Sequence, residues 1–161
     1  MLTNRMDQQT LETTLALACE WAKDHEQLIL LHGAPLGSQH LDDARLVGVK
    51  KPSRIRILIV DRIPLPNDEQ LAEVSREKQI LTTASRGCTF GYGIMIRADS
   101  WGDRELLLHQ LVHVAQYERT HNLEACIREY VCERAHSPEL TAGPLEEEAR
   151  RIARQIARPK A

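Results

Sequence analysis

The sequence predicts a single α+β domain over residues 1–161, with the last few residues as a tail, in which helices dominate. A length of 161 residues suits one domain. Several segments repeat apolar residues at helical spacing, whereas residues 55–61 (IRILIVD) and 89–97 (TFGYGIMIR) have the β-branched and alternating patterns of strands. These patterns predict about five helices and two or three strands.

The first half of the chain begins with a long helix. Apolar residues recur at helical spacing over 8–32, and Gly33 and Pro35 then end the helix. Residues 35–52 are predicted to be mostly loop, and 55–61 is short enough for a buried strand. A second helix is expected to start at Asn67, because Gln70 three residues later completes a capping-box pattern. Residues 82–88 are polar and contain glycine, which predicts a loop.

The run 89–97 alternates and is predicted to be one strand with one buried face. Gly91 and Gly93 lie on its other face, where they would let another backbone approach closely, so they are candidate substrate-binding residues. The alternative is an edge strand in which the glycines serve no ligand.

Three helices are predicted in the second half. Ser100 and Asp103 form a capping box that opens a helix over 102–119. Further helices are expected over 123–135 and 145–157, separated by proline and glycine.

The composition excludes several classes of protein. Lys and Arg number 21 and Asp and Glu 23, a formal net charge of −2, whereas a protein built to hold nucleic acid needs excess positive charge. No segment approaches the ~20 apolar residues of a membrane helix, and no secretory signal is visible. The four cysteines form no C-x-x-C pair and are expected to be reduced, buried thiols. We therefore expect a cytoplasmic protein that binds neither nucleic acid nor a membrane.

The helix over 102–119 carries the most informative side chains. His109 and His113 are four residues apart, so they share one face of the helix and can bind one zinc ion together. Gln116 and Tyr117 lie on the same polar strip, and apolar residues cover the opposite side. The alternative is a pair of hydrogen-bonded histidines in an ordinary cleft.

The run LLLHQLVHVAQYER resembles the active-site helix of zincin metallopeptidases, whose motif is HExxH. It is most similar to small bacterial zincin-like proteins that carry an HELVHVAQYER-type helix. The segments DRIPLP, GYGIMIRADSWGDRELLLH and LEEEA also look like theirs, so the resemblance extends over about residues 55–149. It implies a zincin-like α+β fold, with a small antiparallel or mixed sheet beside the metal-site helix, and Zn²⁺ as the cofactor.

By this resemblance, His109 and His113 would be the first two zinc ligands. Arg119 stands where metzincins have their third histidine, which excludes that subclass. Gluzincins instead use a Glu from a later helix, in the form E-x-x-A, which matches Glu146. Helical periodicity places Glu146 and Glu148 at the flanks of the buried face, and the resemblance favours Glu146.

Other interpretations of these acidic residues stay open. Glu133 lies 20 residues past His113, as in thermolysin-like gluzincins, and is an alternative third ligand. Carboxylates in the first turn are also favoured by the helix dipole and by i, i+4 pairs such as Glu146–Arg150. Related motifs have Asp where this chain has Arg150, so the support of the ligands should differ. The basic residues near the end of the chain are expected to form a solvated face, and the alternative is a basic patch for an acidic partner; they are Arg150, Arg151, Arg154, Arg158 and Lys160.

Gln110 occupies the position of the catalytic Glu in HExxH. That Glu is the general base, and an amide cannot accept a proton at neutral pH. General-base catalysis is typically worth about 10²–10⁴-fold, so peptide hydrolysis should be impaired while metal binding survives. The chain would be a natural pseudoenzyme or an inactivated variant, or Glu105 or Glu118 would replace the base.

The expected function is therefore that of a zinc-binding, metallopeptidase-like protein with impaired hydrolysis. The alternative is a non-catalytic module that retains the cleft and binds a peptide or protein. A peptide could add to the strand over 89–97 by main-chain pairing. Tyr117, one turn past His113, is a candidate donor to a substrate oxyanion or a half-buried packing residue.

Overall fold

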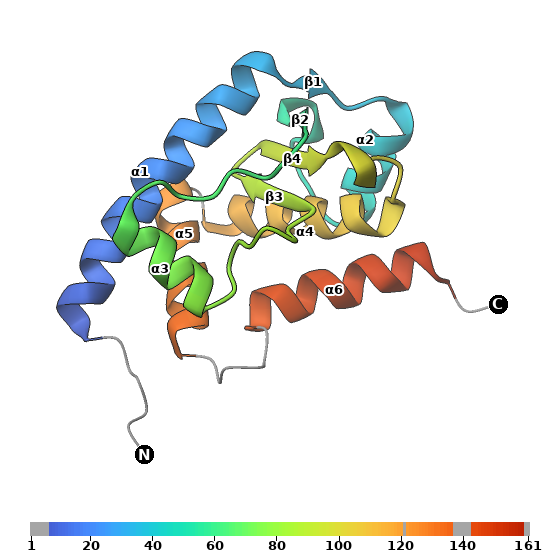
Figure 1. Cartoon of the computed structure of the whole chain (residues 1–161). Coiled ribbons are helices and arrows are strands. Elements are labelled where there is room, and N and C mark those ends of the chain that lie inside the picture. Colours follow the sequence, from blue (N-terminus) through green and yellow to red (C-terminus); the bar gives the residue numbers. More distant parts are fainter. Residues whose placement is uncertain (1–6, 121, 137–142, 160–161) are drawn as a thin grey trace.

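The computed structural model describes residues 7–120, 122–136 and 143–159, and these form a helix-dominated α+β fold (Figure 1). The described residues hold a four-stranded sheet and six α-helices. The elements are α1 (Gln8–His32), β1 (Ala34–Pro35), α2 (Ser38–Leu46), β2 (Arg56–Val60), α3 (Glu69–Glu77), β3 (Gly87–Phe90), β4 (Gly93–Arg97), α4 (Arg104–Thr120), α5 (Leu123–His136) and α6 (Pro144–Ala157). The end of the predicted tail, 160–161, lies outside the described residues.

The sheet is mixed, with the strand order β1-β2-β4-β3. The central strands β2 and β4 run parallel, with Arg56 opposite Gly93, whereas β1 and β3 each pair antiparallel with their neighbour. The strand β3 therefore forms one edge of the sheet.

The prediction of a single strand over 89–97 is wrong. The chain reverses at Gly91 and Tyr92, and the hairpin begins at Gly87, inside the predicted loop. Gly91 has a φ of +61°, which glycine adopts readily and which suits the first turn position of a tight hairpin. The prediction of one buried face is wrong as well, because Ile94 and Met95 point to opposite faces of β4 and both are buried.

Helices cover both faces of the sheet (Figure 1). On one face Ile94 and Ile96 pack against Leu108 and Val112 of α4. On the other face α1 crosses the sheet, and Ile29 packs against Gly93, where a Cβ atom would lie only 3.0 Å from the Ile29 side chain. The helix that carries the two histidines is thus fixed to a rigid sheet.

Three of the long helices match the sequence predictions closely, whereas the short helix α2 was not predicted. The helices predicted over 8–32, 123–135 and 145–157 match α1, α5 and α6 to within a residue at each end. The prediction of mostly loop over 35–52 is wrong, because α2 lies there. Its N-cap, Gly37, offers no side chain to mark the start of the helix.

Two predicted helix starts are shifted. Asp68 caps α3, rather than Asn67, and accepts a hydrogen bond from the backbone N–H of Leu71 at 2.9 Å. At α4, the Oδ1 atom of Asp103 accepts from the N–H of Leu106 at 3.1 Å, so Asp103 takes the capping role expected of Ser100. Both helices are capped by the aspartate nearest to their first turn.

The cysteines are free thiols, but only Cys19 is fully buried, and Cys88, Cys126 and Cys132 are half-buried. Burial raises the pKa of Cys88 to about 12, so this thiol stays protonated. Among the described helices, none combines the length and the apolar character that crossing a membrane requires.

Candidate metal centre

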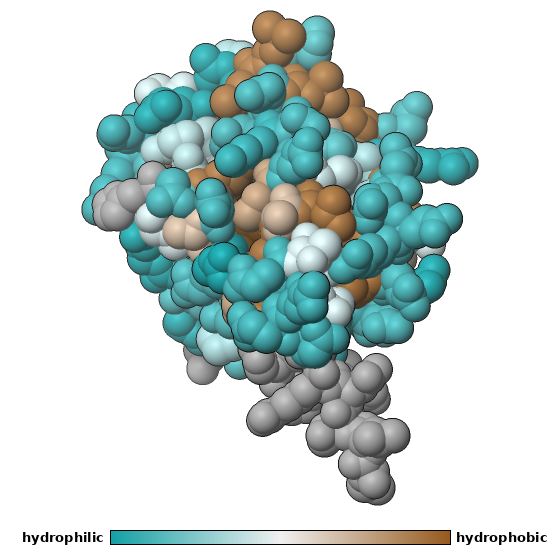
Figure 2. All heavy atoms as spheres, turned by 90° about the vertical axis from the view of Figure 1, so that its left-hand side faces the viewer, coloured by the Kyte–Doolittle hydropathy of each residue, from teal (hydrophilic) through white to brown (hydrophobic). Residues whose placement is uncertain are grey.

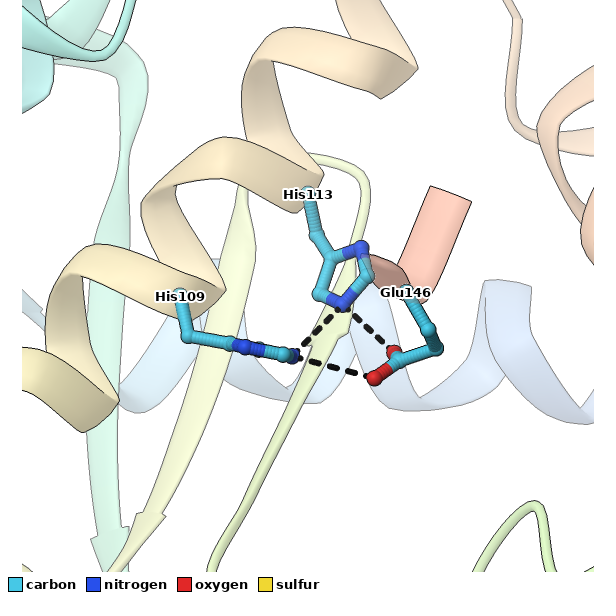
Figure 3. Close-up of side chains that lie close together, drawn as sticks. All are labelled: His109, His113 and Glu146. Carbon is cyan, nitrogen blue, oxygen red and sulfur yellow. Dashed lines mark hydrogen bonds and ion pairs between the residues drawn. The ribbon is translucent and has the colours of Figure 1, made fainter. Parts of the chain in front are cut away.

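Two histidines of α4 and one glutamate of α6 point toward one another (Figure 3). The Nε2 atom of His113 lies 2.8 Å from Oε1 of Glu146, and the Nε2 atom of His109 lies 3.2 Å from Oε2. The two Nε2 atoms are 3.2 Å apart. The structure thus brings together the three residues that the sequence predicts as ligands.

These separations fit a divalent cation such as zinc. Ligand atoms about 2.0–2.1 Å from a tetrahedral zinc ion lie about 3.3 Å from one another. The three side chains already present two imidazole nitrogens and a carboxylate at close to this spacing, and each side chain is less than one-fifth exposed. A metal would therefore need only small side-chain adjustments to bind.

The positions follow from the local sequence. The i, i+4 spacing places the two imidazoles on one side of α4, where they meet edge to face with ring centroids 4.9 Å apart. The helix α6 begins with Gly143 as its N-cap and Pro144 at its first position, which places Glu146 in the first turn. The two helices lie side by side and antiparallel, so the start of α6 faces the middle of α4 (Figure 1).

The electrostatics favour a charged carboxylate at the site. Burial by itself raises the pKa of Glu146, but hydrogen bonds and positive charge from His109 and His113 outweigh burial and hold that pKa below its ordinary value. Glu146 thus stays ionised, which is the state that binds a cation.

Gln116 forms a hydrogen bond with the ring nitrogen of His113 that faces away from Glu146. Its amide nitrogen donates to the carbonyl oxygen of Leu145 and to Oε1 of Glu148, both at 2.9 Å. Its Oε1 atom, 2.8 Å from Nδ1 of His113, must then be the acceptor. With the Nδ1–H group of His113 donating to Gln116, Nε2 is the ring nitrogen that faces the site. A protonated Nε2 donates to Glu146, and a metal that displaces this proton would bind the Nε2 lone pair.

The other acidic candidates lie elsewhere. Glu148 pairs with Arg119 at 2.6 Å, besides its contact with Gln116. Glu133 accepts a hydrogen bond from the N–H of Leu145 at 3.1 Å and so holds the start of α6. The structure therefore places Glu146, rather than Glu148 or Glu133, with the histidines.

Tyr130 of α5 also reaches the site, and sequence reasoning missed it. Its hydroxyl donates to Oε1 of Glu146 at 3.3 Å, and its ring centroid lies 6.2 Å from that of His113. Burial, together with the charge of Glu146, raises the pKa of Tyr130, so the hydroxyl keeps its proton and remains a donor. No sequence signal marks this residue, because its role depends on how α5 packs against α6.

Gln110 is buried between α4 and the edge strand β3. Its Oε1 atom accepts a hydrogen bond from the hydroxyl of Thr89 at 2.8 Å. Its amide nitrogen lies so close to Gly87 that a Cβ atom there would be 3.0 Å away. The amide of Gln110 therefore packs directly against this strand.

The predicted substrate-binding residues pack against other parts of the protein, and Gly91 also lines the cavity beside the candidate ligands. A Cβ atom at Gly91 would collide with the carboxylate of Glu26, and Gly93 makes room for Ile29, so both glycines permit the close approach of α1. The ring of Tyr117 packs edge-on against Tyr92, with centroids 5.3 Å apart.

The two substitute bases considered above have other contacts. Glu118 accepts hydrogen bonds from the backbone N–H groups of Lys50 and Lys51 and from the hydroxyl of Tyr92. Glu105 lines the cavity and pairs with Arg158 at 2.9 Å.

The three candidate ligands line a cavity of about 770 Å³. The whole of β3 borders this cavity, and α1, α3, α5 and α6 contribute further side chains. A volume of this size holds a short peptide segment or a drug-sized molecule. No protein-family model matches the chain, and comparisons with curated proteins and with solved structures give no match either.

Proposed function

We propose that this protein binds Zn²⁺ through His109, His113 and Glu146 in a zincin-like cleft that takes a peptide or protein segment, with impaired hydrolysis. The observation that carries the proposal is the spacing of the three ligand atoms, 2.8–3.2 Å, at the wall of a large cavity. The four free thiols fit a reducing compartment, and we place the protein in the cytoplasm.

Three protein ligands leave a fourth position of a tetrahedral site open, which is typical of catalytic rather than structural zinc. When bound there, zinc would polarise a carbonyl group or lower the pKa of a water molecule. The chain's own contribution to hydrolysis is weak, because the Gln110 amide cannot take up a proton. Tyr130 hydrogen-bonds to Glu146, and Gln116 hydrogen-bonds to His113. These two contacts would hold the metal ligands in place whether or not residue 110 can act as a general base.

Peptide binding is supported by the position of β3. This strand is the edge of the sheet and lines the cavity along its whole length. An extended segment can add to such an edge by main-chain hydrogen bonds. Its path would pass the three ligands, since Gln110, next to His109, contacts Thr89 of the strand.

A non-catalytic binding module is the second candidate, and one observation favours it. Gln110 is 5% exposed, its oxygen accepts from Thr89 and its nitrogen packs against Gly87. These contacts suit a neutral amide. A charged carboxylate at this position would lose its contact with water, which is unfavourable. The cleft would then recognise a peptide without cutting it.

Zinc titration of the purified, metal-free protein tests the proposal. We expect one zinc ion per chain, and we expect His109→Ala or His113→Ala to abolish tight binding. The matched control is His32→Ala, which alters an exposed histidine at the end of α1. A wild-type protein that binds no zinc would contradict the proposal.

Peptidase assays on a denatured protein substrate then separate the two functions. Activity gained by Gln110→Glu in the zinc-loaded protein identifies a disabled peptidase. Inactivity of both forms, with zinc bound, supports the binding module.

A further inference from the structure

Two arginines of α6, together with the arginine that follows the helix, line the cavity on one side of the candidate metal ligands. Arg150, Arg154 and Arg158 follow Glu146 at steps of four residues, so they form one row along the helix. The sequence predicted a solvated face for these residues. They are exposed, but they also border the cavity. Lys160, the last basic residue of the sequence, lies outside the described residues.

The three arginines carry more positive charge than the neighbouring carboxylates balance. Glu105 of α4 pairs with Arg158 at 2.9 Å and approaches Arg154 at 3.9 Å. Arg150 makes no ion pair within the part of the chain that the structure describes, because Glu146, its expected partner, faces the histidines. Three guanidinium groups against one carboxylate give this wall a charge of +2, although the whole chain carries −2.

A negatively charged ligand could displace Glu105 from its ion pairs with Arg154 and Arg158. Arg154 and Arg158 are 67% and 69% exposed, and exposed pairs contribute little free energy. A carboxylate of a ligand in the cavity can therefore replace Glu105 at little cost. Arg150 needs no such exchange, and it lies only one helical turn from the candidate zinc ligand Glu146.

The opposite end of the cavity is mainly apolar, although Thr14, Ser75 and Arg134 also line it, with Arg134 donating to the carbonyl oxygen of Lys78. There the lining comes from α1, α3 and α5, with Ala18, Leu71, Val74, Ile127 and Val131. Figure 2 shows apolar atoms in the middle of the face that these helices border. The helix α6 runs away from them, so its arginine row lies at the other end (Figure 1). The three metal ligands stand between the two ends.

We infer that the cleft selects peptides that are apolar on one side of the metal and acidic on the other, with Arg150 as the residue that determines the acidic preference. This inference rests on the proposed function, because it takes the cavity as a peptide cleft. An acidic peptide suits the row better than a nucleic acid, since the chain as a whole is negative and has few aromatic residues for stacking.

The test uses a fluorescein-labelled peptide with an apolar half and a glutamate half, and a matched peptide with glutamine in place of glutamate. Fluorescence anisotropy with the zinc-loaded full chain should show about fivefold tighter binding of the glutamate peptide in low salt. The difference should shrink as salt rises from about 0.05 M to about 0.5 M, because exposed charges are screened.

Arg150→Gln should reduce the ratio of the two peptide affinities by about threefold. Arg151→Gln is the matched control, because it removes the same charge from the next residue of α6, which is exposed and is not part of the cavity lining. Circular dichroism checks the fold of both variants, and zinc titration of each separates an effect on the metal from an effect on the peptide.

Equal binding of the two peptides by the wild-type protein would overturn the inference. So would an equal loss in the two variants, since the effect would then be one of net charge. Tighter binding of a single-stranded oligonucleotide, with the same dependence on Arg150, would assign the row to nucleic acid. If zinc is not bound, the proposed function fails, but the same peptide pair still tests the charge preference in the metal-free protein.

Discussion

The Nδ1 atom of His113 lies 2.8 Å from the Oε1 atom of Gln116, and this contact determines which nitrogen of the imidazole faces Glu146. The Gln116 amide cannot turn over without losing its two donor contacts to Leu145 and Glu148. A single side chain of α4 thereby orients a ligand and holds the first turn of α6.

Replacing Gln116 with methionine should therefore weaken zinc binding. Partners that orient ligands typically change metal affinity by about 10–100-fold, and methionine keeps the volume without the hydrogen bonds. A competition titration against a chromogenic chelator measures the change. Gln155→Met, at an exposed position of α6, serves as the control. Unchanged affinity in a folded Gln116→Met protein would show that His113 needs no such support.

Zinc should raise the thermal stability of the protein. The candidate metal ligands come from both α4 and α6, so a bound ion would join the two helices. An ion that binds only the folded state, at about 100 times its Kd, adds ~2.7 kcal/mol of stability. Scanning calorimetry should show a higher Tm with zinc and a return to the metal-free Tm after EDTA. The same addition should leave His109→Ala unchanged, and a zinc-dependent shift in that variant would point to another site.

Gly91→Ala should destabilise the fold without changing zinc affinity. The φ of +61° disfavours alanine, and its Cβ atom would collide with Glu26, so we expect a loss of about 1–3 kcal/mol in urea unfolding. Gly37→Ala is the control, because no atom lies within 4 Å of its added Cβ and its φ is negative. A stable Gly91→Ala protein with weakened peptide binding would instead favour the substrate-binding role predicted for this glycine.

Glu26→Gln should stabilise the protein at neutral pH. Burial raises the pKa of Glu26 above its ordinary value of 4.5, although the N–H of Tyr92 and the charge of Arg54 oppose this shift. A raised pKa means that folding favours the protonated form, so wild-type stability is fully present below pH 4.5 and falls as pH rises through the folded pKa. Glutamine is neutral throughout and still accepts from Tyr92.

Urea unfolding at a series of pH values measures this effect. The advantage of Glu26→Gln over the wild type should disappear in acid and grow toward about pH 7. Glu20→Gln, at an exposed position of the same helix, is the control. An advantage that does not depend on pH would assign the effect to packing instead of charge.

The sequence predicted best what local spacing determines. The helix α1 and the pair His109 and His113 follow from helical periodicity alone. Glu146 followed from the resemblance to gluzincins, with periodicity leaving Glu148 open. The hairpin was missed because the alternation of β3 continues across Gly91 into β4, so a reversal and a straight strand give the same pattern.

The contacts that complete the site could not be predicted in this way. Gln116 and Tyr130 act across three helices, and nothing in their neighbouring residues shows which side chain each will meet. The same holds for Arg150, which periodicity places on α6 but which becomes a cavity residue only when α6 packs beside α4.

The division of the ligands between α4 and α6 has a consequence for protein synthesis. The ribosome releases both histidines well before Glu146, with the whole of α5 in between. A nascent chain therefore carries both imidazoles before the third candidate ligand is present. A cation that needs all three groups can therefore bind only after α6 has emerged, and a chain that stops before α6 would lack both Glu146 and the buried core residues Ala149 and Ala153.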